Sequence, residues 1–321
     1  MKIVNQYEFG TSDVLIVEEQ PIPIIEDGQI LIKGIYTSIN YADIKKRIGN
    51  KGEGNFPITL GLDIAGIVEE SKSKHFKKGD RVIAFPARGT YAQYVISQEN
   101  LTYKIPNELS FEQAAAMPTV SFLAAILLEE IGTVKQHDTV IIHSAAGGVG
   151  SMLVQLAKHL NVHKTIATVG SSEKFEYVNN LGADIVCTYE DFVDVTLNET
   201  DHNGANVIFD SIAGEITSNS LRCLDNYGTL VQFGNSSGIK GKFTTADVHS
   251  SCRSIKGFSL GTTRQLRPEF IRPYAEKMIS YFAKGIFELS IDKIFDLSDV
   301  KEAHAYFENR KHRGKILLKI Q

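Results

Sequence analysis

One short glycine-rich segment constrains the fold more than any other part of the chain. Residues 145–150 read Ala-Ala-Gly-Gly-Val-Gly, which fits the pattern G-x-G-x-x-G with alanine at the first glycine position. A run of β-branched residues at 139–143 precedes it and is typical of a strand buried on both faces. Apolar residues at helical spacing follow it, from Val149 to Leu160. This order of strand, glycine turn and helix predicts a unit that binds the pyrophosphate of a dinucleotide.

The residue types of the loop fit that role. Gly147 allows the backbone to approach a pyrophosphate, and Gly150 allows the helix to pack closely on the strand. Ala146, Gly148 and Val149 lie where the first N–H groups of the helix and its positive dipole end would face the phosphates. An ordinary surface loop is the alternative for any glycine-rich match, but here the strand and the helix are both expected.

Strands and helices alternate through the middle of the chain. Beyond the loop we expect helices at 172–181 and 215–224 and strands at 165–169, 184–189, 205–210, 229–233 and 254–259. Gly182 is expected to end the first of these helices. Six strands joined by helices predict a doubly wound parallel sheet, so the fold class is α/β.

The two ends of the chain follow another pattern. The first third contains short β segments broken by glycine, at 29–35, 66–70, 81–85 and 91–96. After the sixth strand of the middle region come a helix at 268–283 and a β segment at 315–320. This tail does not continue the βαβ pattern, and we expect it to fold back onto the first domain.

Composition excludes several classes of partner and location. The 34 basic and 38 acidic residues give a net charge of −4, which offers no electrostatic reason to expect nucleic acid or a membrane surface. The longest apolar stretch, 122–128, is far shorter than the ~18 residues of a membrane span. The first residues do not resemble a secretory signal, and the three cysteines are not spaced as a redox or zinc pair. A cytoplasmic protein with free thiols is expected.

The chain also indicates which dinucleotide it binds. An NAD enzyme usually has an acidic residue about 20 residues beyond the glycine loop, where the ribose hydroxyls are bound. Here Gly170 and Ser171 leave room, and Lys174 can pair with a phosphate on the adenosine ribose, which favours NADP(H). Two alternatives remain, because Glu173 could turn inward to prefer a free hydroxyl, or Lys174 could be an ordinary surface lysine.

Further motifs extend over essentially the whole chain, in a fixed order. Asn40, Tyr41, Asp43, Arg47 and Gly49 form an N-x-x-D-x-x-x-R-x-G segment. The other segments are 57–68, which fits P-x-x-x-G-x-[DE]-x-[AS]-G-x-V, and then 78–82, 89–94, 145–150, 170–174, 181–184 and 314–316. In these motifs the chain resembles the zinc-independent quinone oxidoreductases of the medium-chain dehydrogenase/reductase superfamily.

The resemblance implies a domain organisation and an assembly. Residues 1–116 and 263–321 would form a GroES-like β domain, and residues 117–262 a Rossmann dinucleotide-binding domain inserted into it. A homodimer is expected, with two Rossmann sheets joined edge to edge through their last strands. The apolar segment 255–260 would otherwise be an exposed sheet edge.

The resemblance also indicates a site without metal. Zinc-containing relatives have a cysteine where this chain has Asn40 and a His-Glu pair where it has Leu62 and Asp63. They also have a cluster of four cysteines that this sequence lacks. Since a tetrahedral zinc needs about four Cys, His or carboxylate ligands, no metal is expected.

The remaining site residues come from the resemblance alone. Tyr189 matches a tyrosine that packs near the adenosine phosphate, and Lys315 matches a lysine near the cofactor cleft. Gly234 and Asn235 fall where the family places backbone against the nicotinamide. One position departs from the family, because Leu123 stands where many members have a threonine, and this leaves the substrate open.

The predicted reaction is hydride transfer from NADPH to a quinone or an α,β-unsaturated carbonyl, both of which accept hydride without a metal. Asn40 and Tyr41 are the expected catalytic residues, since each can donate a hydrogen bond to the substrate oxygen. Either could instead be structural, with Asn40 capping a helix and Tyr41 half-buried beside it. Rival functions are an enoyl-thioester or alkenal reductase and a non-catalytic NADPH-binding structural or regulatory protein. A single-stranded nucleic-acid binder lacks the basic stripe it would need.

Overall fold

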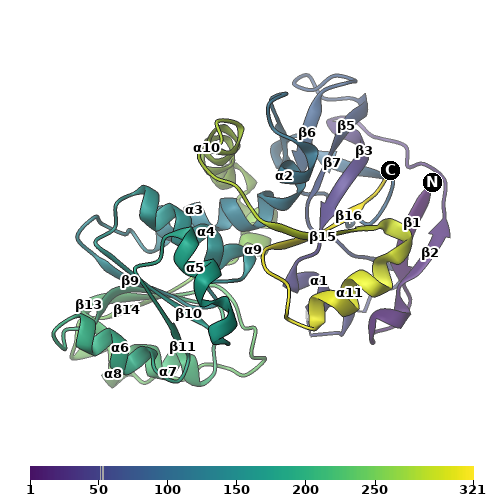
Figure 1. Cartoon of the computed structure of the whole chain (residues 1–321). Coiled ribbons are helices and arrows are strands. Elements are labelled where there is room, and N and C mark those ends of the chain that lie inside the picture. Colours follow the sequence, from purple (N-terminus) through teal and green to yellow (C-terminus); the bar gives the residue numbers. More distant parts are fainter. Residues whose placement is uncertain (51, 53) are drawn as a thin grey trace. The chain divides into compact units, whose positions relative to one another are not determined.

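The computed structural model describes residues 1–50, 52 and 54–321. The chain divides into two compact units (Figure 1). Unit 1 combines Met1–Thr119 with Arg264–Gln321, so both chain ends belong to it, and unit 2 is Val120–Thr263. The sequence analysis places the corresponding boundaries after residues 116 and 262.

Unit 2 contains a six-stranded sheet in the order β11-β10-β9-β12-β13-β14, with every neighbouring pair parallel. The chain runs from β9 to one edge and then returns to the other side of β9, which is the doubly wound arrangement predicted from the sequence. Its strands are β9 (Thr139–Ile142), β10 (Lys164–Val169), β11 (Ile185–Thr188), β12 (Ala205–Asp210), β13 (Leu224–Gln232) and β14 (Ser254–Gly257).

The helices of unit 2 connect these strands. They are α3 (Leu123–Ile126), flanked by π-helical turns at Pro118–Phe122 and Leu127–Ile131, α4 (Gly148–His159), α5 (Phe175–Leu181), preceded by a 3-10 turn at Ser172–Lys174, α6 (Phe192–Glu199), α7 (Glu215–Arg222) and α8 (Thr245–His249). All four residues of β9 are buried, as expected for a central strand covered on both faces. Gly182 ends α5 with φ +110°, in the left-handed region that favours glycine, so this prediction is confirmed.

Unit 1 is built mainly on antiparallel strands. The larger sheet has the order β15-β16-β3-β5-β6-β8, with β7 also paired to β3, and a smaller sheet has the order β2-β1-β4. The strands are β1 (Lys2–Gln6), β2 (Ile16–Glu19), β3 (Gln29–Ser38), β4 (Ile58–Thr59), β5 (Ile64–Ser71), β6 (Arg81–Ala84), β7 (Tyr94–Gln98), β8 (Thr102–Lys104), β15 (Ile291–Asp296) and β16 (Lys315–Lys319).

The helices that lie wholly or partly in unit 1 are α1 (Tyr41–Arg47), α2 (Phe111–Ala116), α9 (Leu260–Leu266), α10 (Arg272–Ala283) and α11 (Val300–Glu308). Short 3-10 turns occur at Ser12–Val14, Glu99–Leu101, Pro268–Ile271 and Leu297–Asp299. The last strand, β16, pairs antiparallel with β3, so the chain's tail does fold back onto its first part.

The prediction that this tail abandons the βαβ pattern is wrong. β15 and β16 are parallel neighbours, and α11 connects them. Only Phe295 of β15 is buried, while Asp292, Lys293 and Ile294 are exposed. Because β15 is an edge strand with charged residues on its open side, its sequence lacks the apolar run that marks a buried parallel strand.

Three other predicted strands differ in extent for local reasons. β7 starts at Tyr94 rather than at residue 91. β13 starts five residues earlier than expected, and Tyr227 interrupts its pattern with φ +61°. β14 ends at Gly257 because Ser259 turns the chain into α9, where its carbonyl accepts the N–H of Thr263 at 3.0 Å. The final strand is therefore shorter than the apolar segment on which the sequence analysis placed the dimer contact.

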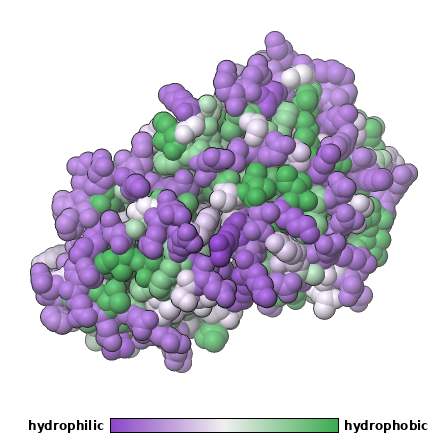
Figure 2. Space-filling view, in the orientation of Figure 1, coloured by the Kyte–Doolittle hydropathy of each residue, from purple (hydrophilic) through white to green (hydrophobic). Residues whose placement is uncertain are grey.

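The face in Figure 2 is mainly hydrophilic, with hydrophobic side chains in separate patches. In the described part of the chain, every helix is too short or too polar to cross a lipid bilayer.

A buried hydrogen-bond network joins α1 to α11 inside unit 1. Arg47 is 1% exposed, and its guanidinium contacts His304 Nδ1 at 3.0 Å and Glu308 at 2.8 Å. Since arginine can only donate, Nδ1 of His304 accepts, and its Nε2–H therefore points to the Tyr91 hydroxyl at 3.0 Å. Burial, reinforced by the charge of Arg47, lowers the pKa of His304 to about 3. His304 is thus held neutral in the folded protein.

This network predicts a pH-dependent stability. In the unfolded chain His304 protonates near its ordinary pKa of 6.5, whereas the folded protein resists protonation until about pH 3. The contribution of neutral His304 to the free energy of unfolding is therefore complete above pH 6.5 and is lost as the pH falls toward 3. Between pH 6.5 and pH 4 the wild type should lose about 2–3 kcal/mol more unfolding free energy than His304→Gln. Urea unfolding of both proteins at several pH values measures this, and parallel pH profiles would contradict it.

Candidate functional site

The glycine loop of unit 2 connects β9 to α4 through a tight turn. Ser144 adopts φ +56°, and its carbonyl accepts the N–H of Gly147 at 2.9 Å. A Cβ atom at Gly150 would lie 2.3 Å from the carbonyl oxygen of Ser144, closer than any side chain can approach. Gly150 therefore permits the close packing of helix on loop that the sequence analysis expects at this position.

The loop lies where a dinucleotide site is expected in this architecture. Strand order reverses between β9 and β12, and ligands of doubly wound sheets bind at such a switch point beyond the carboxyl ends of the strands. Gly147 is the N-cap of the twelve-residue helix α4, and Gly148 and Val149 begin its first turn. Ala146 is buried, while Gly147, Gly148 and Val149 are half-buried. The unpaired N–H groups of this turn can hold phosphate oxygens.

The residues expected at the adenosine ribose follow β10. The Ser171 hydroxyl accepts the N–H of Glu173 at 3.3 Å and so starts the turn Ser172–Lys174. A Cβ atom at Gly170 would meet the ring of Tyr189 at 3.7 Å, an ordinary van der Waals distance, so Gly170 lies against that ring. Lys174 ends the turn and is half-buried.

Two further groups follow other parallel strands of the same sheet, β11 and β13. Tyr189 comes directly after β11, and its hydroxyl accepts the N–H of Ser144 at 3.1 Å. Gly234 and Asn235 come after β13, and a Cβ atom at Gly234 would lie 2.8 Å from the carbonyl oxygen of Ser211. Because the strands are parallel, these residues and the glycine loop lie at one edge of the sheet. Unit 2 thus brings its predicted cofactor residues to one edge.

Asn40 and Lys315 meet in a buried polar cluster of unit 1. Asn40 is 6% exposed and precedes α1, where its backbone N–H donates to the Asp43 carboxylate at 2.8 Å. The Lys315 ammonium, 4% exposed, donates to Asn40 Oδ1 at 2.8 Å and to the carbonyl of Ile39 at 3.3 Å. Asn40 Nδ2 in turn donates to the Ser38 hydroxyl at 3.0 Å. The bond to Lys315 fixes which end of the Asn40 amide carries the hydrogens.

Two buried carboxylates accompany Lys315. Burial lowers the pKa of Lys315, and the charges of Asp63 and Asp43 oppose this effect. Burial also raises the pKa of Asp43 to about 6, although the N–H groups of Asn40 and Gly61 favour its charged form. Burial therefore outweighs both the directed hydrogen bonds and the attraction of Lys315 in setting the pKa of Asp43.

The sequence analysis assigned no role to Asp63 or Arg264. Asp63 is fully buried and accepts hydrogen bonds from the Ser38 hydroxyl at 2.7 Å and the Thr119 N–H at 3.1 Å. Arg264 donates to the Leu62 carbonyl at 3.2 Å and lies 4.9 Å from the centre of the Phe85 ring. The acidic position in the 57–68 motif was the available signal for Asp63, whereas Arg264 had none.

Tyr41 differs from Asn40 in its surroundings. It is the first residue of α1 and is 36% exposed, with the Lys45 ammonium 5.8 Å from its ring centre. Tyr41 is therefore exposed rather than half-buried as the structural alternative in the sequence analysis has it, whereas Asn40 does stand at a helix start. Neither observation tests a catalytic role.

In this chain, the residues at the positions where related enzymes bind zinc do not fit a metal ion. Leu62 has no donor atom, and the oxygen of Asn40 already accepts from the cationic Lys315, which would repel a second cation. In the stretches that the structure describes, no three His, Cys, Asp or Glu side chains gather in a way that could hold a metal ion.

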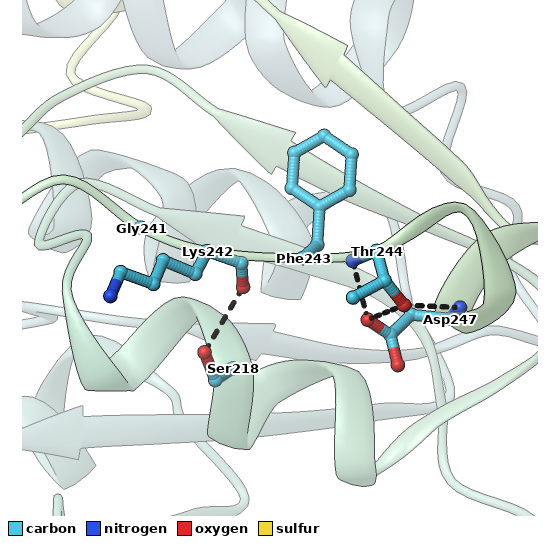
Figure 3. Close-up of a pocket in the computed structure, with 6 residues that line it drawn as sticks. All are labelled: Ser218, Gly241, Lys242, Phe243, Thr244 and Asp247. Atoms are coloured by element: carbon cyan, nitrogen blue, oxygen red, sulfur yellow. Dashed lines mark hydrogen bonds between the residues drawn. The ribbon is translucent and has the colours of Figure 1, made fainter.

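A surface hollow in unit 2 is lined by residues to which the sequence analysis assigns no role (Figure 3). It is lined by Ser218, Gly241, Lys242, Phe243, Thr244 and Asp247. Its polar groups largely bond one another, with the Ser218 hydroxyl donating to the Lys242 carbonyl at 3.0 Å and Thr244 donating to Asp247. The hollow therefore offers no group that points to the predicted chemistry.

Known proteins with related sequences agree with this architecture. Residues 26–107 match the family model "Alcohol dehydrogenase GroES-like domain", and residues 148–276 match "Zinc-binding dehydrogenase". A probable quinone oxidoreductase of Schizosaccharomyces pombe is 34% identical over 98% of this chain and 96% of its own length. A synaptic vesicle membrane protein VAT-1 homolog-like of mouse is 28% identical over all of this chain and 82% of its own.

A solved structure extends the similarity to three dimensions. Escherichia coli quinone oxidoreductase complexed with NADPH superimposes with a TM-score of 0.93 at 28% identity, covering all of both chains. The architecture is thus a GroES-like antiparallel domain with a six-stranded Rossmann-type sheet. The chain belongs to the quinone oxidoreductase family of the medium-chain dehydrogenase/reductase superfamily.

Proposed function

We propose that the protein is an NADPH-dependent oxidoreductase that reduces quinones or α,β-unsaturated carbonyls without zinc. The observation that carries the proposal is the buried Asn40–Lys315 pair, because it puts an oriented amide donor where zinc-containing relatives have a metal ligand. Quinones and enones suit such a site, since the charge from hydride addition goes to an oxygen that hydrogen bonds can stabilise. Simple alcohols do not, because their oxidation needs an alkoxide that a metal normally generates.

The residues of unit 2 fit NADPH. The close packing of α4 on the loop that Gly150 allows and the N–H groups of the first turn of α4 suit a pyrophosphate, and Lys174 suits a ribose phosphate. The related Escherichia coli enzyme was crystallised with NADPH, which supports the same cofactor here. When bound, NADPH supplies the hydride.

The chain's own contribution is to bind and polarise the substrate oxygen. Asn40 Nδ2 carries two hydrogens, of which one bonds the Ser38 hydroxyl at 3.0 Å. The other has only the Ser38 carbonyl at 3.5 Å, too long for a good hydrogen bond, so it can be offered to a substrate. Lys315 strengthens this donor, because its positive charge draws electron density toward Oδ1. Tyr41 is the second proposed donor, from the more exposed start of α1.

The experiment is a substrate panel followed by the absorbance of NADPH. Benzoquinones, naphthoquinones and small enones should be reduced, and ethanol and isopropanol with NADP⁺ should not be oxidised. Faster oxidation of either alcohol than reduction of any quinone or enone would refute the proposal. Enoyl thioesters and alkenals in the same panel test the rival reductases. Cofactor binding without turnover of any electrophile would favour the structural or regulatory alternative.

The cellular setting and assembly are also proposals. The free cysteines, with Cys187 and Cys223 buried and Cys252 exposed, support a reducing cytoplasmic location. A homodimer would pair the edge strand β14 of two copies, which would satisfy the unpaired N–H and C=O groups of that edge. Light scattering at micromolar concentration should give twice the chain mass, and a monomer mass would reject the dimer.

A further inference from the structure

A directed chain of hydrogen bonds in unit 1 ends at the Asn40 amide. Thr37 of β3 pairs with Ile64 of β5. The residues next to this pair, Ser38 and Asp63, lie close together and are both fully buried. The Ser38 hydroxyl donates to Asp63 Oδ1 at 2.7 Å, and Asn40 Nδ2 donates to the Ser38 hydroxyl at 3.0 Å. The Asp63 carboxylate is thus linked to the Asn40 amide through one serine.

The direction of each hydrogen bond follows from the groups that take part. The Lys315 ammonium can only donate, so Asn40 turns Oδ1 toward it and Nδ2 toward Ser38. The Ser38 oxygen accepts from Asn40, and its single hydrogen goes to the Asp63 carboxylate. Turning the Asn40 amide around would place its own hydrogens against the ammonium.

Asp63 is itself held in a fixed orientation. Its second carboxylate oxygen, Oδ2, accepts the backbone N–H of Thr119 at 3.1 Å. Two cations of unit 1, Lys315 and Arg264, are attracted to its negative charge. A hydrogen bond to a charged acceptor is about twice as strong as one between neutral groups, so Asp63 decides which way the Ser38 hydroxyl points.

We propose that Asp63 is a positioning residue, which aims the Asn40 amide at the substrate oxygen through the Ser38 hydroxyl. Ser38 holds one Nδ2 hydrogen of Asn40, and this gives the other hydrogen a defined direction. Asp63 does not contact the substrate in this account and acts only through Asn40. The inference rests on the proposed function, in which Asn40 donates to the substrate.

The test is a double-mutant cycle between Ser38→Ala and Asn40→Ala, with kcat and KM measured for a quinone and for NADPH. Ser38→Ala alone should lower kcat roughly three- to tenfold, as expected for one lost neutral hydrogen bond, with little change in the KM for NADPH. In the Asn40→Ala background it should lower kcat no further, because the amide that Ser38 orients is gone. Equal losses of kcat in both backgrounds would show that Ser38 acts independently of Asn40 and would overturn the proposal.

Asp63→Asn is the second variant. It keeps the size of the side chain, but its single carbonyl oxygen cannot accept from both the Ser38 hydroxyl and the Thr119 N–H. It should lower kcat at least as much as Ser38→Ala does, and again not in the Asn40→Ala background. A wild-type kcat in Asp63→Asn would contradict the proposal. If Asp63→Asn fails to fold, the Ser38 cycle decides by itself.

Ser97→Ala is the matched control. Ser97 is 1% exposed in unit 1, and its hydroxyl accepts from the Thr102 hydroxyl at 3.0 Å. This variant removes a buried serine hydroxyl and leaves the contacts of Asn40 in place, so kcat should stay at the wild-type value. A loss as large as that of Ser38→Ala would mean that any such deletion in unit 1 lowers turnover, and the proposal would fall.

A readout without substrate separates this proposal from the proposed function. With isotope-labelled asparagine side chains, the Asn40 Nδ2 resonance is identified as the one that disappears in Asn40→Ala. Its hydrogens should exchange with solvent faster in Ser38→Ala and Asp63→Asn than in the wild type or Ser97→Ala. Unchanged exchange in both would overturn the proposal. If the wild type reduces no quinone or enone, the proposed function fails, while the exchange rates still decide whether Asp63 orients the amide.

Discussion

Asn40→Ala is expected to lower the turnover of quinones or enones by about a hundredfold or more while leaving NADPH binding nearly intact. A well-aimed donor to a developing oxyanion contributes ~2.7–4 kcal/mol to the transition state, which corresponds to this loss. The Asn40 amide is well oriented because both of its polar atoms are hydrogen-bonded. Oδ1 accepts from Lys315 at 2.8 Å, and Nδ2 donates to the Ser38 hydroxyl at 3.0 Å. NADPH binding is largely spared because its proposed contacts, apart from Lys315, come from unit 2.

Asn40 also starts α1, so its structural contribution needs a matched control. Asn40→Ser keeps a residue that is as good at a helix N-cap but has no amide hydrogens. If the amide is the catalytic group, alanine and serine should lose similar turnover; if capping is what counts, serine should restore it. Measured kcat and KM for both variants, with thermal unfolding as a check, separate the two. Full turnover by Asn40→Ala would show that the oxygen-binding role is assigned wrongly.

Lys174→Ala is expected to weaken NADPH binding by roughly tenfold to a hundredfold, with little change for NADH. A charge-assisted hydrogen bond contributes about 1.5–3 kcal/mol when it is shielded, and about 1.4 kcal/mol is tenfold in affinity. Lys174 is half-buried and lies in the turn after β10. Gly170 and Ser171 stand there in place of the acidic residue that NAD enzymes usually have. Only the ribose phosphate distinguishes the two cofactors, so only NADPH should respond.

Lys164→Ala is the control for this prediction. Lys164 begins the same strand, β10, at its opposite end, where its ammonium pairs with Glu199 at 3.0 Å. Its removal takes away one positive charge from unit 2 without touching the carboxyl edge of the sheet. The ratio of NADPH to NADH affinity should stay at the wild-type value. Equal losses of both cofactors in Lys174→Ala would mean that Lys174 does not read the phosphate.

The sequence by itself determined the features that depend on local pattern. The β-branched run of β9, the glycine loop and the helical spacing of α4 are continuous in the chain, and each restricts the backbone where it stands. Gly150 and Gly182 were identified for the same reason, since a close approach or a positive φ allows only glycine there. Together with the ordered motifs, these patterns were enough to establish the fold class and the family.

The tertiary structure alone decided which polar groups meet. Lys315 reaches Asn40 across 275 positions of the chain, and Arg47 meets His304 across 257. The Tyr189 hydroxyl accepts the N–H of Ser144 at 3.1 Å, although the two residues are 45 positions apart. The parallel edge strand β15 was not predicted, because it is mostly exposed and has charged residues in place of the apolar run of a buried strand. Such contacts carry no periodic signal, because a buried hydrogen bond depends on the partner that folding brings within about 3 Å and not on neighbours along the chain.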